Sequence, residues 1–329
     1  MSSTKKIIIV FSCILFVSLI GMGITLAVYF NTGNNVNEFG NIFGGGRFEV
    51  KESADFDLSG INAVEINCTS ADVHIVESDK PGVRLEGVVV APNPQREYLQ
   101  VEKRDGTVYI KVDYKGSFLN IFTGFNLTVY MPSDNMLDLS VDCKSGDIDT
   151  AGMRFNNLTV SRTSGDVKIE NCSAKMFDCG AASGNTIISA CDFESSNIVS
   201  MSGDTRISGT TGSIRVRSTS GQINIEGAKG ALDIGCTSGD ISIAMADGEM
   251  HPVTAGLTSG NIRLYVPRTA AFNLEARTTS GNLTSDLDIA VSGKLSGSFI
   301  QKQLSGTVNG GGPAVTVTVT SGDISIIGK

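Results

Sequence analysis

The sequence predicts an all-β fold, a two-sheet parallel β-solenoid with coils of about 19 residues. Two observations predict it. A Ser-Gly-Asp/Asn step recurs from Ser145-Gly146-Asp147 to Ser321-Gly322-Asp323, with glycines 19, 19, 19, 18, 18, 21, 21 and 41 residues apart. Residues two and four positions after each glycine are mostly aliphatic, and the residue directly after it is polar. A fixed period of this length indicates stacked structural repeats, and the alternation indicates strands with one buried face.

At the N-terminus, residues 1–6 are expected to form a cytoplasmic tail and Ile7 to Phe30 a transmembrane signal anchor in the membrane lipid. Those 24 residues carry no charge, which at 1.5 Å per residue gives a helix of about 36 Å, enough to span a bilayer. Lys5 and Lys6 precede the span, so the positive-inside rule places the remainder outside the cell. The alternative is a cleaved signal peptide, although the apolar stretch is long and Leu26 to Phe30 offers no clear cleavage site.

Residues 31–47 are rich in Asn and Gly and are predicted to form a flexible stalk. Residues 48–132 should contain a first coil at 61–77, where Ala71 replaces the glycine, and then an antiparallel meander over 83–131. The Asp105-Gly106 pair predicts a hairpin within this meander. We expect it to cap one end of the solenoid, because an open sheet edge invites aggregation.

Residues 133–329 are predicted to form the repeat solenoid. A second strand precedes each turn, because the residue five positions before the glycine is apolar in all nine copies. Each coil is therefore strand, Ser-Gly turn, strand and second turn, and stacking buries a continuous core between two parallel sheets. An antiparallel sandwich is the competing fold, but hairpins need not repeat their sequence in register.

Seven cysteines in an extracellular chain could form a disulfide set. Cys13 lies in the predicted span, and the other six fall on inward positions of the repeat, where a small hydrophobic residue fits. We therefore expect buried free thiols. The one plausible disulfide joins Cys172 and Cys191, which share a position on adjacent coils.

The Asp/Asn ladder from Asp147 to Asp323 is the best metal candidate, because a cation could bridge stacked carboxylates. Asn replaces Asp freely and Gln222 replaces it once, so hydrogen bonding to the turn backbone explains the ladder better. The serine recurs in every coil, and the two histidines, His74 and His251, stand in no metal-binding pattern. The sequence thus predicts no catalytic, cofactor-binding or metal-binding residue and no cofactor.

The net charge of −8 includes two lysines and no acid in residues 1–30, so residues 31–329 carry −10. This negative charge argues against a nucleic-acid partner, because the phosphates of a nucleic acid would be repelled. The outward positions three after the glycine mix residue types without a focus, which argues against an enzyme acting on polysaccharide. These residues are Asp149, Lys168, Ile187, Arg206, Asn224, Ser242, Arg263, Thr284 and Ser325.

The apolar strand, the T-S-G-D-I-x-I step (Thr237 to Ile243, Thr320 to Ile326) and the Gly-containing turn resemble the bacterial putative-adhesin β-repeat family, over residues 48–329. The resemblance implies a domain of unknown function in cell-envelope proteins, with no established catalytic residues. We therefore expect a non-enzymatic, membrane-anchored extracellular module that acts as an adhesin or meets an envelope glycan or protein. The alternatives are a regulatory or sensory ectodomain in an envelope stress response and, more remotely, a β-helix enzyme acting on polysaccharide. The sequence does not give the oligomeric state.

Overall fold

The computed structural model describes residues 46–91, 97–113, 123–134, 136–248, 250–291 and 302–329. The predicted tail, span and most of the stalk lie outside these residues. Within the described residues, the structure contains no helix with the length and hydrophobicity of a membrane span. The larger of two compact units comprises residues 51–87, 97–114 and 124–329, and the coils belong to it. The first residues of β1 and β7 and the last residues of β4 fall in the smaller unit.

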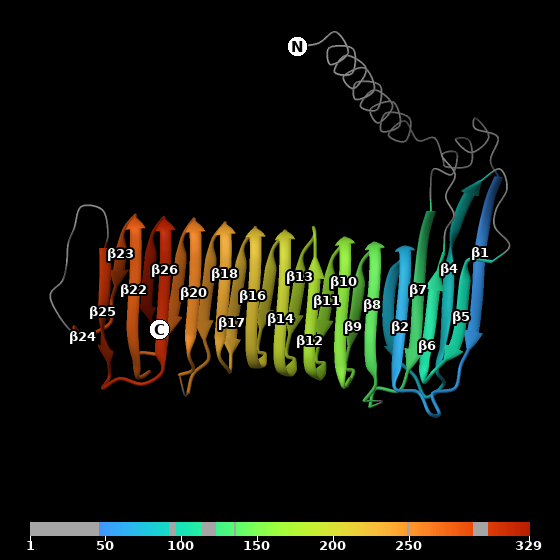
Figure 1. Cartoon of the computed structure of the whole chain (residues 1–329), viewed down its shortest axis with the longest axis horizontal. Helices are drawn as coiled ribbons and strands as arrows, with labels where there is room; N and C mark the ends of the chain where they lie inside the picture. Colours follow the sequence, from blue (N-terminus) through green and yellow to red (C-terminus); the bar gives the residue numbers. More distant parts are fainter. Residues whose placement is uncertain (1–45, 92–96, 114–122, 135, 249, 292–301) are drawn as a thin grey trace, which may run out of the picture. The chain divides into compact units, whose positions relative to one another are not determined.

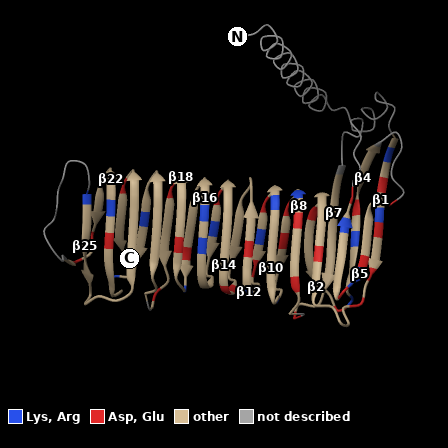
Figure 2. Ribbon diagram, in the orientation of Figure 1, with Lys and Arg blue, Asp and Glu red and all other residues tan. Residues whose placement is uncertain are grey.

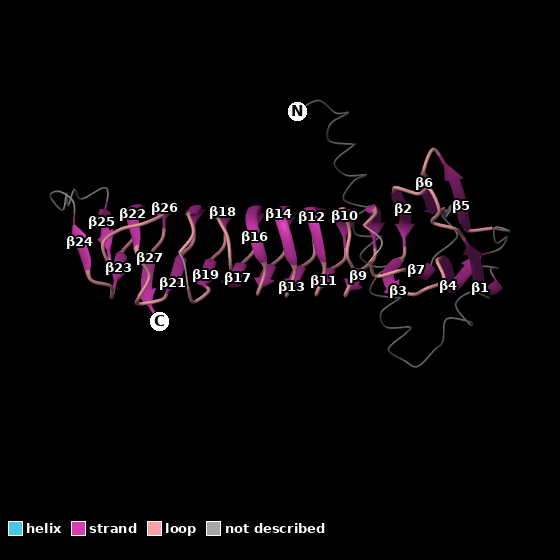
Figure 3. Ribbon diagram, turned by 90° about the horizontal axis from the view of Figure 1, so that it is seen from below, coloured by secondary structure: helices cyan, strands magenta, loops and turns pink. Residues whose placement is uncertain are grey.

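The described residues form two sheets that face each other (Figure 3). In spatial order, sheet A contains β1 (Gly46–Asp55), β4 (Gly82–Ala91), β7 (Thr123–Met131), β3 (Asp72–Glu77), β9 (Ile148–Ala151), β11 (Val167–Glu170), β13 (Thr186–Ser189), β15 (Thr205–Ser208), β17 (Ile223–Ala228), β19 (Ile241–Met245), β21 (Ile262–Val266), β27 (Ile324–Gly328) and β23 (Leu283–Ser285). Sheet B contains β24 (Ile289–Val291), β25 (Lys302–Val308), β22 (Phe272–Ser280), β26 (Ala314–Ser321), β20 (Val253–Ser259), β18 (Leu232–Ser238), β16 (Thr211–Ser220), β14 (Asp192–Ser202), β12 (Ser173–Ala181), β10 (Asn157–Ser164), β8 (Asp138–Ser145), β2 (Ala63–Ser70), β6 (Thr107–Val112) and β5 (Leu99–Arg104).

The predicted solenoid is confirmed, because equivalent strands of successive coils pair in parallel and in register. In sheet B, Val160 of β10 pairs with Val141 of β8 and Cys179 of β12. In sheet A, Ile169 of β11 pairs with Thr150 of β9 and Ile188 of β13. The position five before the glycine is buried in all nine coils. Burying each aliphatic side chain there stabilises the fold by roughly 1.5–3 kcal/mol.

The coils do not stack in sequence order at either end (Figure 1). β26 and β27, the last coil, lie between the coil of β20 and β21 and the coil of β22 and β23. Among the described residues, the 41-residue spacing before Gly322 contains the antiparallel strands β24 and β25. At the other end, β2 and β3 lie directly beside β8 and β9.

The N-terminal cap agrees with the prediction in part. β5 and β6 form the expected antiparallel hairpin, and Asp105 and Gly106 at its turn have φ of 51° and 76°. Both positive values fit a two-residue type I′ turn. β6 and β7, however, pair in parallel with β2 and β3, so this part of the expected meander is one more coil of the solenoid.

Candidate functional site

The Ser-Gly-Asp step forms a corner between the two sheets. Gly165 has φ of 116°, which an L-residue rarely adopts, and a Cβ at this position would overlap the carbonyl group of Gly146 in the preceding coil. The corner glycines of the other copies have positive φ as well. The glycine is therefore required by both the backbone conformation and the stacking distance.

The Asp/Asn residue that follows the glycine links its corner to the next coil in eight places. Its side-chain oxygen accepts a hydrogen bond from the backbone N–H of the equivalent residue one coil further on. These pairs are Asp72 and Asp147 (2.9 Å), Asp147 and Asp166 (2.7 Å), Asp166 and Asn185 (2.7 Å), Asn185 and Asp204 (3.1 Å), Asp204 and Gln222 (3.0 Å), Asp240 and Asn261 (2.8 Å), Asn261 and Asp323 (3.1 Å), and Asp323 and Asn282 (2.6 Å).

The relay confirms that the ladder hydrogen-bonds to backbone, although the bond crosses to the next coil instead of closing its own turn. Asp and Asn are interchangeable because each offers a side-chain oxygen at the same reach. Among the described residues, no group of three or more His, Cys, Asp or Glu side chains is arranged to hold a metal ion. In each of the eight pairs, the Oδ1 atom of the Asp or Asn side chain is engaged by a backbone donor, which gives the ladder a structural role.

The cysteines differ from the prediction. Cys68 of β2 and Cys143 of β8 are joined by a disulfide, with their Cα atoms 4.7 Å apart. The expectation of free thiols at these two positions was wrong, because β2 lies beside β8 despite 75 residues of separation. Cys172, Cys179, Cys191 and Cys236 are free and buried. Burial raises the pKa of the Cys179 and Cys191 thiols to about 11, so both are protonated.

The suggested Cys172–Cys191 disulfide is absent from the structure. Each of these thiols instead approaches a backbone carbonyl two residues earlier in its own coil. The Cys172 Sγ lies 3.2 Å from the oxygen of Glu170, and the Cys191 Sγ lies 3.3 Å from the oxygen of Ser189. The common position on adjacent coils thus accommodates two small buried side chains.

One inward position holds a charge that the repeat pattern did not single out. Arg162 of β10 is only 5% exposed, at the position three before the glycine where other coils have Cys, Ala, Ser, Leu, Thr or Val. Its Nη2 donates to the carbonyl oxygen of Asn185 at 2.7 Å, and burial lowers the pKa of its guanidinium. Arg162 thereby bridges two coils from inside the stack.

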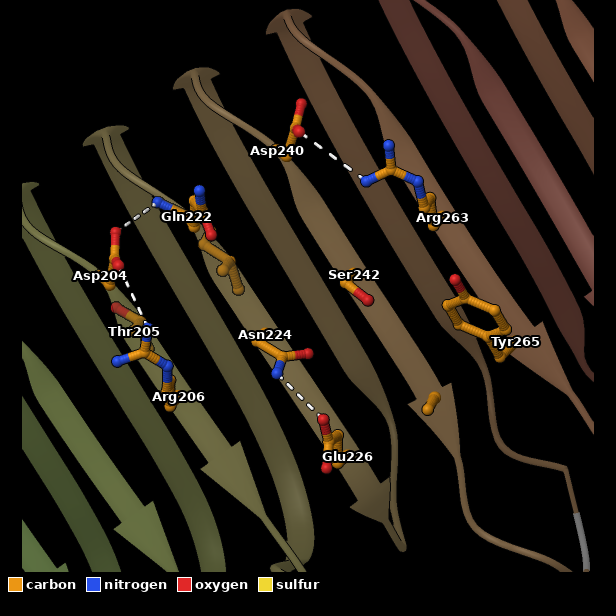
Figure 4. A pocket seen from close by; sticks show the side chains of 12 residues that line it. Asp204, Thr205, Arg206, Gln222, Asn224, Glu226, Asp240, Ser242, Arg263 and Tyr265 are labelled. Atoms are coloured by element: carbon orange, nitrogen blue, oxygen red, sulfur yellow. Dashed lines mark hydrogen bonds and ion pairs between the residues drawn. The ribbon is translucent and has the colours of Figure 1, made fainter.

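A groove lies on the outer face of sheet A, and we call it the sheet A groove (Figure 4). It has a volume of about 510 Å³ and is lined by outward side chains of β15 to β21. Two rows cross it. Asn224, Ser242 and Arg263 are register partners on β17, β19 and β21, and so are Glu226, Ala244 and Tyr265. The small Ser242 and Ala244 form the floor between two walls of larger side chains.

The walls of the groove are held by polar contacts. On one wall the Asn224 amide donates to Oε1 of Glu226 at 3.0 Å. On the other, Nη1 of Arg263 lies 3.8 Å from Oδ2 of Asp240, and the Tyr265 ring is half-buried. Arg206 lies beyond the first wall, with Nη2 3.5 Å from Oδ2 of Asp204. The two arginine contacts are long, and they leave most hydrogen-bonding positions of the guanidinium groups open to the solvent.

Four of the outward residues singled out in the sequence, Arg206, Asn224, Ser242 and Arg263, therefore line one groove as successive register partners. The grouping of these outward side chains into a site is recognised only when the residues five positions after the glycine are also considered, because these supply Glu226 and Tyr265. Elsewhere on sheet A, His74 lies on the exposed face with its Nδ1 2.5 Å from Oδ1 of Asp149. His251 is half-exposed before β20. Both positions agree with a surface role for the histidines.

Sheet B carries a second depression, of about 570 Å³ and of different chemistry. Gly235 and Gly256 form its floor as register partners, with Thr237 and Thr258 beside them. Arg217 closes one side, where its Nη2 binds Oδ2 of Asp233 at 2.6 Å and lowers the pKa of that carboxyl. This surface presents methyl groups and backbone, and it lacks the opposed polar walls of the sheet A groove.

The Toastrack DUF4097 family model matches residues 61–244 and 213–327. No curated protein matches the chain in sequence. Three solved structures are similar to the chain. A putative adhesin from Bacteroides fragilis is 15% identical, with 86% of this chain and 97% of that chain covered and a TM-score of 0.40. A putative adhesin from Parabacteroides distasonis is 10% identical (85% and 97% covered, TM-score 0.44), and a putative cell adhesion protein from Clostridium sporogenes is 10% identical (86% and 100% covered, TM-score 0.23).

Proposed function

The chain belongs to the Toastrack DUF4097 family, and from this premise we propose that it is a non-enzymatic, membrane-anchored module that recognises a component of the cell envelope, as an adhesin does. The family membership confirms the resemblance drawn from the Thr-Ser-Gly-Asp steps. The sheet A groove is the observation that carries the proposal. It is an open polar hollow built on the outward positions that the repeat leaves free to vary.

The proposed location is the cell membrane, crossed once by Ile7 to Phe30, with the N-terminus in the cytoplasm and the β-solenoid outside. The uncharged stretch and the lysines before it support this arrangement. The Cys68–Cys143 disulfide supports it independently, because structural disulfides persist in oxidising compartments and are rare in the cytosol.

A binding role is supported over catalysis by the way the groove residues are partnered. Asp204 and Asp240 each face an arginine, and Glu226 accepts from Asn224. A general acid and base on a glycan would need two carboxyl groups opposed across the scissile bond with their pKa values pushed apart. The side chains of the sheet A groove are instead spread along two walls, which suits holding a ligand.

The location is tested with the full chain carrying a C-terminal epitope tag, expressed in a Gram-positive cell. We expect antibody to reach the tag on intact cells, added protease to remove it, and detergent to be needed to extract the chain. A tag that is protected on intact cells, or a chain released by carbonate without detergent, would contradict the proposal.

The recognition itself is tested by co-sedimentation of the purified full chain in nanodiscs with isolated cell envelopes. We expect the chain to be retained by the envelope and no soluble sugar to be released over time. Release of reducing ends would show an enzyme, and capture of a membrane kinase as the sole partner would favour a regulatory ectodomain.

A further inference from the structure

We propose that the sheet A groove binds a neutral glycan chain, with one sugar ring lying on the floor of Ser242 and Ala244 against Tyr265. This inference rests on the proposed function, because it names the chemical class that the surface module recognises. It also assigns a role to five side chains that the folding of the coil does not require.

The shape of the groove favours a narrow, extended ligand. Its two walls stand on β17 and β21, two strand spacings or about 10 Å apart, and the floor strand β19 carries only Ser242 and Ala244 on this face. The volume of about 510 Å³ lies in the range of small-ligand sites, but the groove is open along its length and its walls are polar. An extended ligand can therefore lie along the strand direction, because neither end of the groove is closed.

The two walls offer different contacts to a sugar ring. Tyr265 presents a rigid aromatic surface with a hydroxyl at its tip, and a half-buried ring of this kind loses little conformational entropy on binding. The carbon-bound hydrogens of a pyranose face pack against such a ring. Opposite Tyr265, the carboxylate of Glu226 retains acceptor positions besides the one that Asn224 fills.

The hydrogen-bonding groups match hydroxyl chemistry. A sugar hydroxyl donates one hydrogen bond and accepts others, so it needs donors and acceptors side by side. Arg263 supplies guanidinium donors, because its contact with Asp240 at 3.8 Å is loose and uses one of its nitrogen atoms. Glu226 supplies acceptors across the floor. Backbone groups of the sheet are already paired within it, so the specificity must come from these side chains.

The charge of the site argues against an anionic polymer. The charged residues lining the groove are three carboxylates and two arginines, and the arginines face two of the carboxylates. The segment outside the predicted span carries −10 in total, so a polyanion approaches against the field of the protein. Acidic and basic residues are interspersed over the strands of the ribbon in Figure 2.

The test uses the full chain in nanodiscs and titrates it with neutral oligosaccharides of glucose, mannose and N-acetylglucosamine, with a polyuronate as the anionic comparison. We expect at least one neutral series to bind and the polyuronate to bind more weakly. In Tyr265→Ala, loss of the aromatic contact should raise the Kd about 3- to 10-fold. In Ser242→Phe, the new side chain fills the floor, and binding should become undetectable.

A matched control is Ser161→Phe, the same change at an exposed position on the outer face of sheet B. It should bind like the wild type, and all variants should show the wild-type circular dichroism spectrum and melting curve. Binding that survives in Ser242→Phe, binding of the polyuronate alone, or Tyr265-dependent retention of a protein and no glycan would each overturn the inference.

The outcomes separate the inference from the proposed function. If no neutral glycan binds while the C-terminal tag is exposed and the envelope retains the chain, the groove assignment fails and the surface role stands. If the tag is protected on intact cells, the surface role fails whatever the titrations show.

Discussion

Breaking the Cys68–Cys143 disulfide should destabilise the N-terminal coils more than any single surface substitution. The bond closes a loop over a sequence separation of 75 residues, so the chain-entropy estimate for its removal is about 4.5 kcal/mol. At roughly 2 °C per kcal/mol for a domain of this size, the melting temperature of the coils it holds should fall by about 9 °C. The double variant Cys68→Ala, Cys143→Ala and the reduced wild type should behave alike.

The assay is thermal melting with and without reductant, followed by hydrogen exchange of both forms. A repeat array need not unfold in one step, so exchange should locate the loss. We expect faster exchange in β2, β3, β6 and β7, which contact the bonded pair or lie beyond it, and little change in β17 and β19. Mass spectrometry of the unreduced chain must show the Cys68–Cys143 linkage. Free thiols at both positions, or an unchanged melt after verified reduction, would refute the reasoning.

Three further predictions concern the corners and sheet B. Gly165→Ala should lower the free energy of unfolding in urea by at least about 2 kcal/mol, because φ of 116° and the carbonyl of Gly146 both exclude a Cβ. A loss below ~0.5 kcal/mol, which is usual for a surface substitution, would contradict this. Asp166→Ala should cost about 1 kcal/mol, whereas Asp166→Asn keeps the acceptor for the Asn185 N–H and should be nearly neutral; equal costs would show that charge matters instead. Asp233→Asn should cost below about 1 kcal/mol, because the pair with Arg217 is solvent-exposed. Since hydrogen bonding to Arg217 lowers the pKa of Asp233 from 3.8, the stabilisation is present above that value and is lost as pH falls through the lower folded pKa, so the two proteins should converge in strong acid.

The local structure of each coil follows from the sequence because its determinants are local. A positive-φ glycine fixes the corner, and alternation fixes which side chains face the core. The prediction fails where packing overrides the pattern. Leu283 stands at a core position two after Gly281, yet it is half-exposed, because β23 is the edge strand of sheet A. Thr150, Thr186 and Thr205 are buried polar residues at core positions and retain the strand geometry without adding apolar contact.

The order of the coils could not be read from the sequence, because every coil offers the same backbone ladder to its neighbours. The corner of Ser321 lies between those of Ser259 and Ser280, although the repeat pattern would equally allow it to follow that of Ser280 at the end of the stack. The disulfide was missed for the same reason. Cys68 and Cys143 share a repeat position, but they are neighbours only because the coil of β6 and β7 lies on one side of β2 and β3 while β8 and β9 lie on the other. The sheet A groove combines side chains from two outward rows, and one row alone shows no focus.

The coil order also explains how the stack ends. In a parallel solenoid every exposed strand is a template for another parallel strand, including one from a second molecule. At one end of sheet B, β5 pairs antiparallel with β6, and at the other, β25 pairs antiparallel with β22 and carries the three-residue strand β24. An antiparallel strand presents its N–H and C=O groups with a different spacing from a parallel one, so an incoming coil cannot continue the existing ladder in register. The last coil lies inside these end strands, because β26 pairs with β20 on one side and with β22 on the other. In sheet B, termination thus depends on the few strands that break the repeat, while the regular coils between them carry the outward residues of the sheet A groove on their other face.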